Sequence, residues 1–189
     1  MHGMVNRSIE EFVRSTYGEA AWQAAAVACG TDPQGFHILR DYPQELTPRL
    51  LQAAGNPLAK TAAEVAEDVG AWLAGRESLR RLLRFSGTDF AEFLLSLPEL
   101  PGRLRMIVPG LEMPSIEVAG GAEGYRITSV PHQSLWLCAL SGMLHALADD
   151  YGCLAVIVMD DSGLWVSIPL ADYAEARPFS IGGPAAGAA

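Results

Sequence analysis

The sequence predicts an α+β fold in which an N-terminal helical subdomain precedes a β-β-α-β-β subdomain with a four-stranded antiparallel sheet. Apolar residues recur at helical spacing through the first half, and after about residue 114 the spacing becomes that of strands. One long helical pattern separates two predicted hairpins. We expect one domain over residues 1–181, with a helical part to about residue 110 and an α/β part over about 111–181, and then a flexible tail over 182–189.

Start signals divide the first half into several helices. The segment Ser8–Glu11 has the form of a capping box, in which a hydroxyl and a carboxylate bind free N–H groups at a helix start, so we predict a helix from about residue 8 to 28. Thr47-Pro48 predicts another start, and the capping box Thr61–Glu64 begins a helix that ends near Gly75. Leucines and phenylalanines at helical spacing continue the pattern to about residue 97.

The second half contains two predicted hairpins. Residues 115–119 and 125–130 have strand patterns on either side of Gly120-Gly121, and residues 153–159 and 164–168 on either side of the turn 160–163. Between the hairpins, apolar residues at helical spacing over 135–151 predict one long helix. It should stop at Gly152, because glycine readily takes the left-handed conformation after a helix end.

The composition argues against several partners. The formal charge of −9 repels a nucleic-acid backbone or an anionic membrane on average, so we expect neither as a partner. The basic segment 76–84 is the local exception, and its arginines either form a solvated helix face or pair with a partner's acidic patch. Because there is no apolar run of about 20 residues and no signal-peptide pattern at the start, we expect a cytoplasmic protein.

The familiar catalytic motifs do not occur in the sequence. It has no glycine-rich phosphate loop, nucleophile elbow or zinc-protease motif, so we expect no enzymatic activity. Its four histidines and three cysteines are scattered, without the spacing of metal ligands. We therefore expect buried free thiols and no metal site of the ordinary kinds.

An ordered series of short motifs runs through nearly the whole chain. It comprises Met1–Asn6 leading into Ile9–Val13 and Tyr17-Gly18, Asp41-Tyr42-Pro43, Leu82–Phe85 with Phe90–Leu94, Pro109–Pro114, and Gly142–His145. This series resembles the haem nitric oxide/oxygen-binding (H-NOX) domain family. The helical and then β-β-α-β-β order of that family agrees with the pattern described above.

The resemblance implies a haem that is ligated by a proximal histidine, held through its carboxylates by a Tyr-x-Ser-x-Arg stretch, and pressed by a proline. Pro114 matches that proline. Counting back from Pro114 places Pro101 at the histidine position, and proline has no nitrogen lone pair to give iron. Counting back from Gly142 places the carboxylate-binding stretch within Ser129–Ser134, which lacks the motif, and Arg126 is then the nearest substitute.

On the distal side of the implied haem, Ile9 and Ala139 stand where oxygen-binding members have hydrogen-bonding side chains. A haem bound here would face an apolar pocket, which favours NO or CO over O2. Without haem, an empty cavity would be costly, so we expect large side chains near the altered stretch to help fill it, namely Leu135, Trp136 and Leu137.

Two functions follow from the resemblance. The first is an H-NOX-like sensory or signalling domain with a degenerate haem site and no expected cofactor, which regulates a separate partner such as a histidine kinase or a cyclic-nucleotide enzyme. The alternative is a true haem-binding NO/CO gas sensor with a non-standard axial ligand, for which His132 is the first candidate, followed by His145, Cys138 and His37. A third hypothesis, without specific residues behind it, is that the apolar cavity binds another small molecule.

Overall fold

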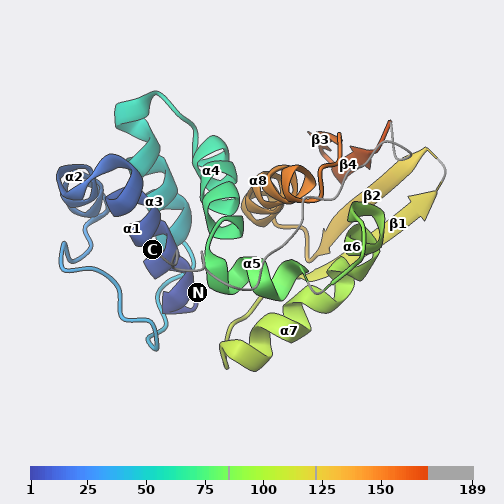
Figure 1. Ribbon diagram of the computed structural model, residues 1–189. Coiled ribbons are helices and arrows are strands. Elements are labelled where there is room, and N and C mark those ends of the chain that lie inside the picture. Colours follow the sequence, from blue (N-terminus) through green and yellow to red (C-terminus); the bar gives the residue numbers. More distant parts are fainter. Residues whose placement is uncertain (85, 122, 170–189) are drawn as a thin grey trace, which may run out of the picture.

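The helical half precedes the sheet, as the sequence predicts. The computed structural model describes residues 1–84, 86–121 and 123–169 (Figure 1). The tail predicted over 182–189 lies outside these residues. The helices of this half are α1 (Gly3–Tyr17), α2 (Glu19–Cys29), α3 (Leu46–Gly55), α4 (Ala62–Ala74), α5 (Glu77–Arg84), α6 (Phe90–Ser96) and α7 (Leu100–Ile107), with short 3-10 turns η1 (Asn56–Leu58) and η2 (Leu97–Glu99).

The first helix begins earlier than predicted, and the prediction of a capping box at Ser8–Glu11 is wrong. His2 is the N-cap of α1, and its Nδ1 accepts the Met4 N–H at 3.3 Å. Ser8 lies inside the helix, where its hydroxyl donates to the Met4 carbonyl at 3.0 Å. The predicted single helix to residue 28 is also divided, because Gly18 adopts a φ of 87° that ends α1 before α2 begins.

Two further starts were predicted, and one is confirmed. Thr61 and Glu64 form both bonds of the capping box at the start of α4. Helix α3 begins at Leu46, one residue before the expected cap. The hydroxyl of Thr47 instead donates to Oδ1 of the buried Asn6 at 2.7 Å and so joins α3 to α1.

We expect Thr61→Ala to lower the free energy of unfolding by about 1 kcal/mol at neutral pH, because it removes an N-cap acceptor and a partner of Glu64. Hydrogen bonds from the Thr61 N–H and hydroxyl lower the pKa of Glu64 in the folded protein. Their stabilising effect is therefore complete above the usual glutamate range, about pH 4.3, and is lost as pH falls through the folded pKa.

Chemical denaturation at neutral and acidic pH measures this difference. Thr16→Ala, on the exposed end of α1, is the matched control and should change stability by less than about 0.5 kcal/mol. Equal losses for the two variants would contradict the capping role.

The second half has the predicted β-β-α-β-β order. Strands β1 (Ser115–Gly121), β2 (Gly124–Val130), β4 (Gly163–Ser167) and β3 (Val156–Asp160) lie side by side in that order, and every neighbouring pair is antiparallel. Helix α8 (Ser134–Asp150) connects the two hairpins, and Gly152 follows its end with a φ of 63°. The third strand begins at Val156, later than the predicted residue 153.

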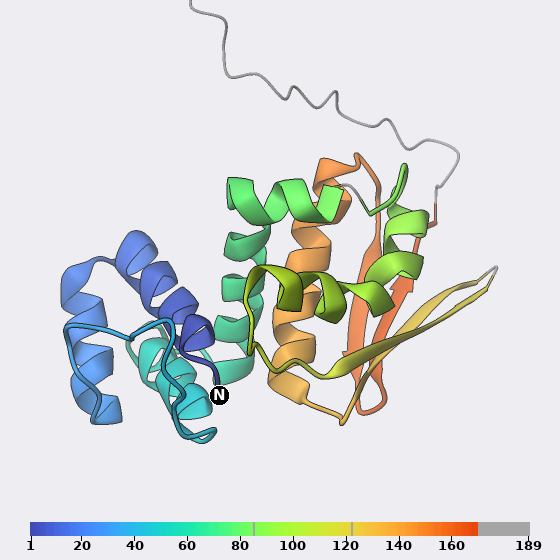
Figure 2. The same ribbon diagram turned by 90° about the horizontal axis from the view of Figure 1, so that it is seen from below.

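Helix α8 lies between α4 and the sheet, as both ribbon views show (Figures 1 and 2). One hydrophobic cluster contains residues of the four helices α1, α2, α3 and α4 together with Cys138 of α8. A second cluster contains residues of α6, α8 and the inner face of the sheet. The inner face contributes Ile127, Leu164 and Val166, all fully buried. Because α8 belongs to both clusters, it couples the two halves of the chain.

Over the described residues, no helix combines the length and apolarity needed to cross a membrane.

Candidate functional site

The two prolines that the resemblance assigns to the proximal side of haem lie in α7 and directly before β1. Pro114 is buried directly before β1, and Pro101 is buried in the first turn of α7. Pro101 does not interrupt a helix, because η2 ends at Glu99 and α7 starts at Leu100. Pro98 and Pro101 therefore each stand in the first turn of a helix, where the missing N–H costs nothing. The carbonyl of Pro101 accepts Nε of Arg105 at 3.2 Å.

The stretch 129–134 forms the connection from β2 to α8. Ser129 is buried, and its hydroxyl accepts the Gln133 N–H at 3.0 Å. Pro131 and His132 are exposed. This connection contains no arginine or lysine, so it supplies no fixed cation for a carboxylate pair.

Arg126 lies on the outer face of the sheet, away from α8. Its guanidinium bonds Asp160 at 2.6 Å and stands 5.3 Å from the centre of the Trp165 ring. Hydrogen bonds from Ser162 and from Arg126 hold the pKa of Asp160 well below its usual range. Arg126 is thus already engaged by an ion pair on the far side of the sheet from the helices.

The two distal positions lie in the helical half and on α8. Ile9 is 3% exposed in the cluster formed by α1 to α4. Ala139 contacts α4, because a Cβ atom built on Gly70 would lie 1.8 Å from its carbonyl oxygen. Pro101, Pro114 and Ile9 are therefore buried and Ala139 lies where α8 meets α4, whereas Arg126 lies on the outer face of the sheet and His132 is exposed.

The other candidate ligands do not converge on one point. His37 and His145 are exposed, like His132. Cys138 is buried, and its thiol contacts the sulfur of Met159 at 3.6 Å. Burial raises the pKa of the thiols of Cys29, Cys138 and Cys153, so they are protonated and poor metal ligands at neutral pH. Among the described residues, no three His, Cys, Asp or Glu side chains are grouped as a metal site.

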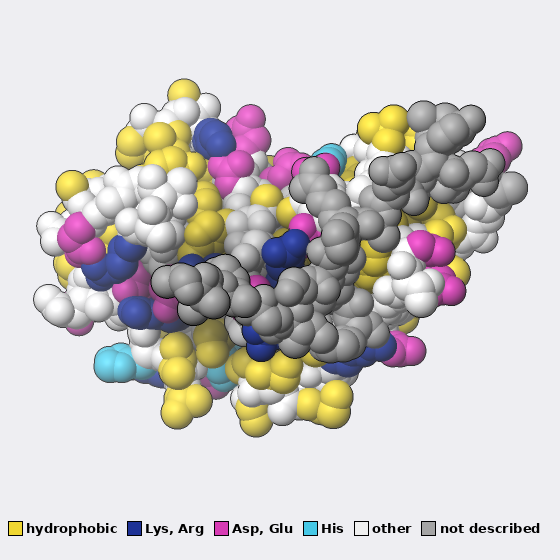
Figure 3. All heavy atoms as spheres, in the orientation of Figure 1, with side chains coloured by type: hydrophobic (Ala, Val, Ile, Leu, Met, Phe, Trp, Pro, Cys, Tyr) yellow, Lys and Arg dark blue, Asp and Glu magenta, His cyan; other side chains and the backbone are white. Residues whose placement is uncertain are grey.

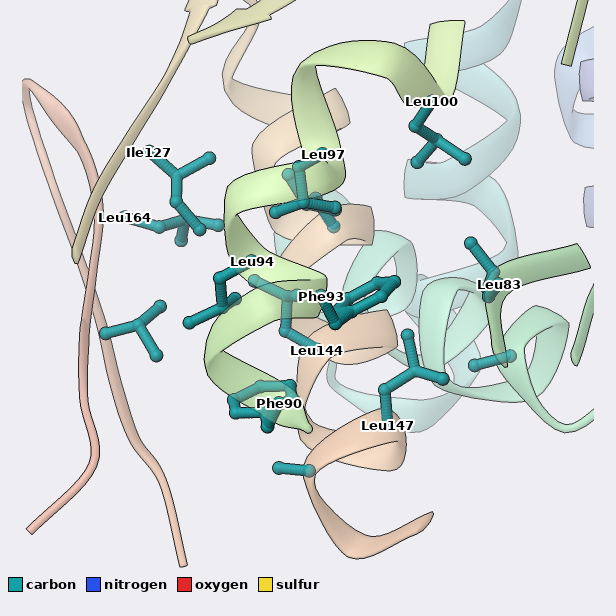
Figure 4. Packing of buried hydrophobic residues seen from close by; sticks show 14 of the residues in the cluster. Leu83, Phe90, Phe93, Leu94, Leu97, Leu100, Ile127, Leu144, Leu147 and Leu164 are labelled. Atoms are coloured by element: carbon teal, nitrogen blue, oxygen red, sulfur yellow. The ribbon is translucent and has the colours of Figure 1, made fainter. Parts of the chain in front are cut away.

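The interior between α6, η2, α8 and the sheet is packed with aliphatic and aromatic side chains (Figure 4). Phe93, Leu94, Leu97 and Leu144 are each at most 1% exposed there. Leu137 belongs to this cluster, Leu135 packs on the other one, and Trp136 is half-buried. At the positions counted from the resemblance the fit to haem is therefore poor, because Pro101 stands where an imidazole is expected and the connection 129–134 offers no cation for the carboxylates.

Two surface hollows lie elsewhere. One of about 470 Å³ is formed by the loop between α2 and α3, and one of about 530 Å³ lies at the junction of α4 and α5. Neither includes a residue of α6, α7, α8 or the sheet.

The arginines of segment 76–81 have partners within the chain. Arg80 forms a bidentate pair with Asp150 at 2.7 Å, and Arg81 pairs with Glu77 at 2.7 Å. Arg76 stacks 4.7 Å from the Trp72 ring centre. Basic and acidic side chains are interspersed on the face shown in Figure 3. This pattern favours a solvated helix face over a basic docking patch.

Sequence reasoning missed the contact between α4 and α8. A Cβ atom on Gly142 would lie 1.9 Å from the Glu67 carbonyl oxygen, so the two helices touch backbone to backbone there, as they do at Gly70. Next to it, the Ser141 hydroxyl donates to Oε1 of Glu67 at 3.1 Å, and Nδ1 of His145 lies 3.5 Å from the same oxygen. Isolated glycines inside helical patterns are the signal that could have revealed this crossing.

The chain is similar to proteins of one kind. A family model described as Haem-NO-binding matches residues 2–151. Soluble guanylate cyclase gcy-31 of Caenorhabditis elegans is 25% identical over 119 residues, which cover 61% of this chain but only 17% of that relative. The structure superposes on an Fe(II) unliganded H-NOX mutant from K. algicida with a TM-score of 0.77 at 14% identity, covering 92% of this chain and 99% of that one. An oxygen-binding H-NOX domain related to soluble guanylate cyclases gives a TM-score of 0.66 at 15% identity, covering 89% and 95%.

Proposed function

Because the chain belongs to the haem-NO-binding family, we propose that it is a signalling domain with a degenerate haem site that acts through a separate partner protein. The observation that carries this proposal is the buried Pro101, which counting back from Pro114 assigns to the position of the axial histidine. A pyrrolidine nitrogen within a peptide bond has no lone pair for iron, so an ordinary fifth ligand is lost.

The surroundings of Pro101 support the same proposal. Two haem carboxylates would need cations in a largely apolar interior, and burying them unpaired would cost several kcal/mol. Arg126, the arginine nearest in sequence to the altered stretch 129–134, is bound to Asp160 on the outer face of the sheet. Fully buried leucines and Phe93 pack between α6, α8 and the sheet.

Regulation of a partner is the role that fits a domain of this family without catalytic motifs. A histidine kinase or a cyclic-nucleotide enzyme is the partner class we propose, and the likeness to a soluble guanylate cyclase supports the second of these. We place this activity in the cytoplasm and propose no catalysis by the domain itself. The signal would pass through α8, which packs on the helical half and on the sheet.

Absorption spectroscopy tests the proposal. The full chain, produced with ample haem supply and also titrated with haem after purification, should give no sharp Soret band and no shift on adding CO or NO. A haem-binding H-NOX protein prepared in parallel is the positive control. A strong Soret band that disappears in one variant among His132→Ala, His145→Ala, Cys138→Ala and His37→Ala would instead establish a haem sensor with a replacement ligand.

A further inference from the structure

Strand β3 is an edge of the sheet and carries little of the protection that edge strands usually have. Within the described residues it pairs only with β4. The segment 153–159 has no charged residue and no proline, and Val156 and Val158 are 48% and 52% exposed. Natural edge strands are commonly blunted by lysine, proline or a bulge, because free N–H and C=O groups invite another strand.

The register of the hairpin shows which backbone groups of β3 bond β4 and which point away from it. Asp160 and Gly163 close a two-residue turn, and such a closing pair exchanges both of its hydrogen bonds. By alternation, Val158 also bonds β4, whereas Ile157 and Met159 direct their N–H and C=O groups away from it. The side chains of Ile157 and Met159 lie on the face of β3 toward α8: Ile157 packs against the core, and the sulfur of Met159, which is 39% exposed, contacts Cys138.

We propose that β3 pairs antiparallel with β3 of a second copy of this chain, about a twofold axis at Val158, so that two sheets join into one. In this register Ile157 of each copy lies opposite Met159 of the other, and these are the residues whose N–H and C=O groups point away from β4. Val158 then faces Val158 in a non-hydrogen-bonded pair, in which side chains approach most closely.

The charges fit a copy of the same strand. Asp160 would lie opposite the uncharged Val156, so no like charges face each other, and Arg126 neutralises Asp160 within its own chain. The opposite edge is less suited to self-pairing, because β1 has Glu117 near its middle and packs against η2 and α7. A strand without charge offers little by which to select a different protein, and its own copy matches it residue by residue.

Sedimentation of the full chain at increasing concentration tests the proposal. The series should reach about 100 μM, because an interface formed by one short strand from each copy is weak. We expect a species of twice the monomer mass to grow with concentration. Val158→Lys places two ammonium groups opposite each other and should raise the dimer dissociation constant at least about tenfold. Val130→Lys, on the same face of the sheet and 50% exposed but away from β3, should dimerise like the unmodified chain.

A charge-reversal pair keeps the test independent of folding defects. Mixing the Val158→Lys and Val158→Asp variants should restore a dimer that neither forms alone. Amide exchange of Ile157 and Met159 should slow as the concentration of the unmodified chain rises. A chain that stays monomeric throughout, or a Val158→Lys variant that dimerises as well as the unmodified protein, would overturn the proposal without affecting the haem question.

Discussion

Phe93→Ala should lower the free energy of unfolding by about 3–5 kcal/mol, the largest loss we expect from a single substitution. Phe93 is 1% exposed and packs against two aromatic rings, 6.1 Å from the centre of Phe90 and 6.0 Å from that of Tyr151. Phe90 and Phe93 belong to α6, and Tyr151 is the residue that follows α8. The cavity left by the ring would therefore open between two elements that are far apart in sequence, where local repacking cannot close it.

Leu95→Ala in the same helix is the matched control. Leu95 is 55% exposed, so its truncation removes little buried surface and should cost below about 1 kcal/mol. Urea denaturation followed by circular dichroism measures both variants. Comparable losses for the two would mean that the interior near α6 is loosely packed.

Gly142→Ala should destabilise the protein by about 2–3 kcal/mol, although alanine is the better helix former by about 1 kcal/mol. The added methyl group would lie 1.9 Å from the Glu67 carbonyl oxygen and 3.0 Å from the Ala71 nitrogen. Both are backbone atoms of α4, so no side-chain rotation can relieve the overlap. The two helices would have to separate, and the buried contacts of α8 on either side would weaken with them.

The same substitution at Gly102 should have the opposite sign. A Cβ atom there meets nothing within 4 Å, and Gly102 lies inside α7 without a positive φ. Gly102→Ala should therefore stabilise the chain by about 0.5–1 kcal/mol. The pair of glycine variants separates the close helix crossing from helix propensity, and a stabilised Gly142→Ala would contradict the crossing.

Local patterns in the sequence predicted much of the fold. The Thr61–Glu64 cap, the order of the strands along the chain and the end of α8 before Gly152 all depend on residues within a few positions of each other. The predicted starts of α1 and α3 were wrong because the residues concerned have partners in distant segments. His2 caps α1 next to a bridge to Asp41, and Thr47 bonds Asn6 across two helices. No spacing rule within one segment contains such partners.

The candidate site divides in the same way. The sequence alone predicts a proline where the resemblance implies an imidazole, and it determines that this residue cannot ligate iron, because the chemistry of a side chain is independent of its surroundings. Only the tertiary structure decided that Arg126 pairs with Asp160, that His132 is exposed and that α8 contacts the backbone of α4 at Gly142. These outcomes depend on strand pairing and helix packing between distant segments, whose free energy is set by surfaces that meet only when the chain is folded.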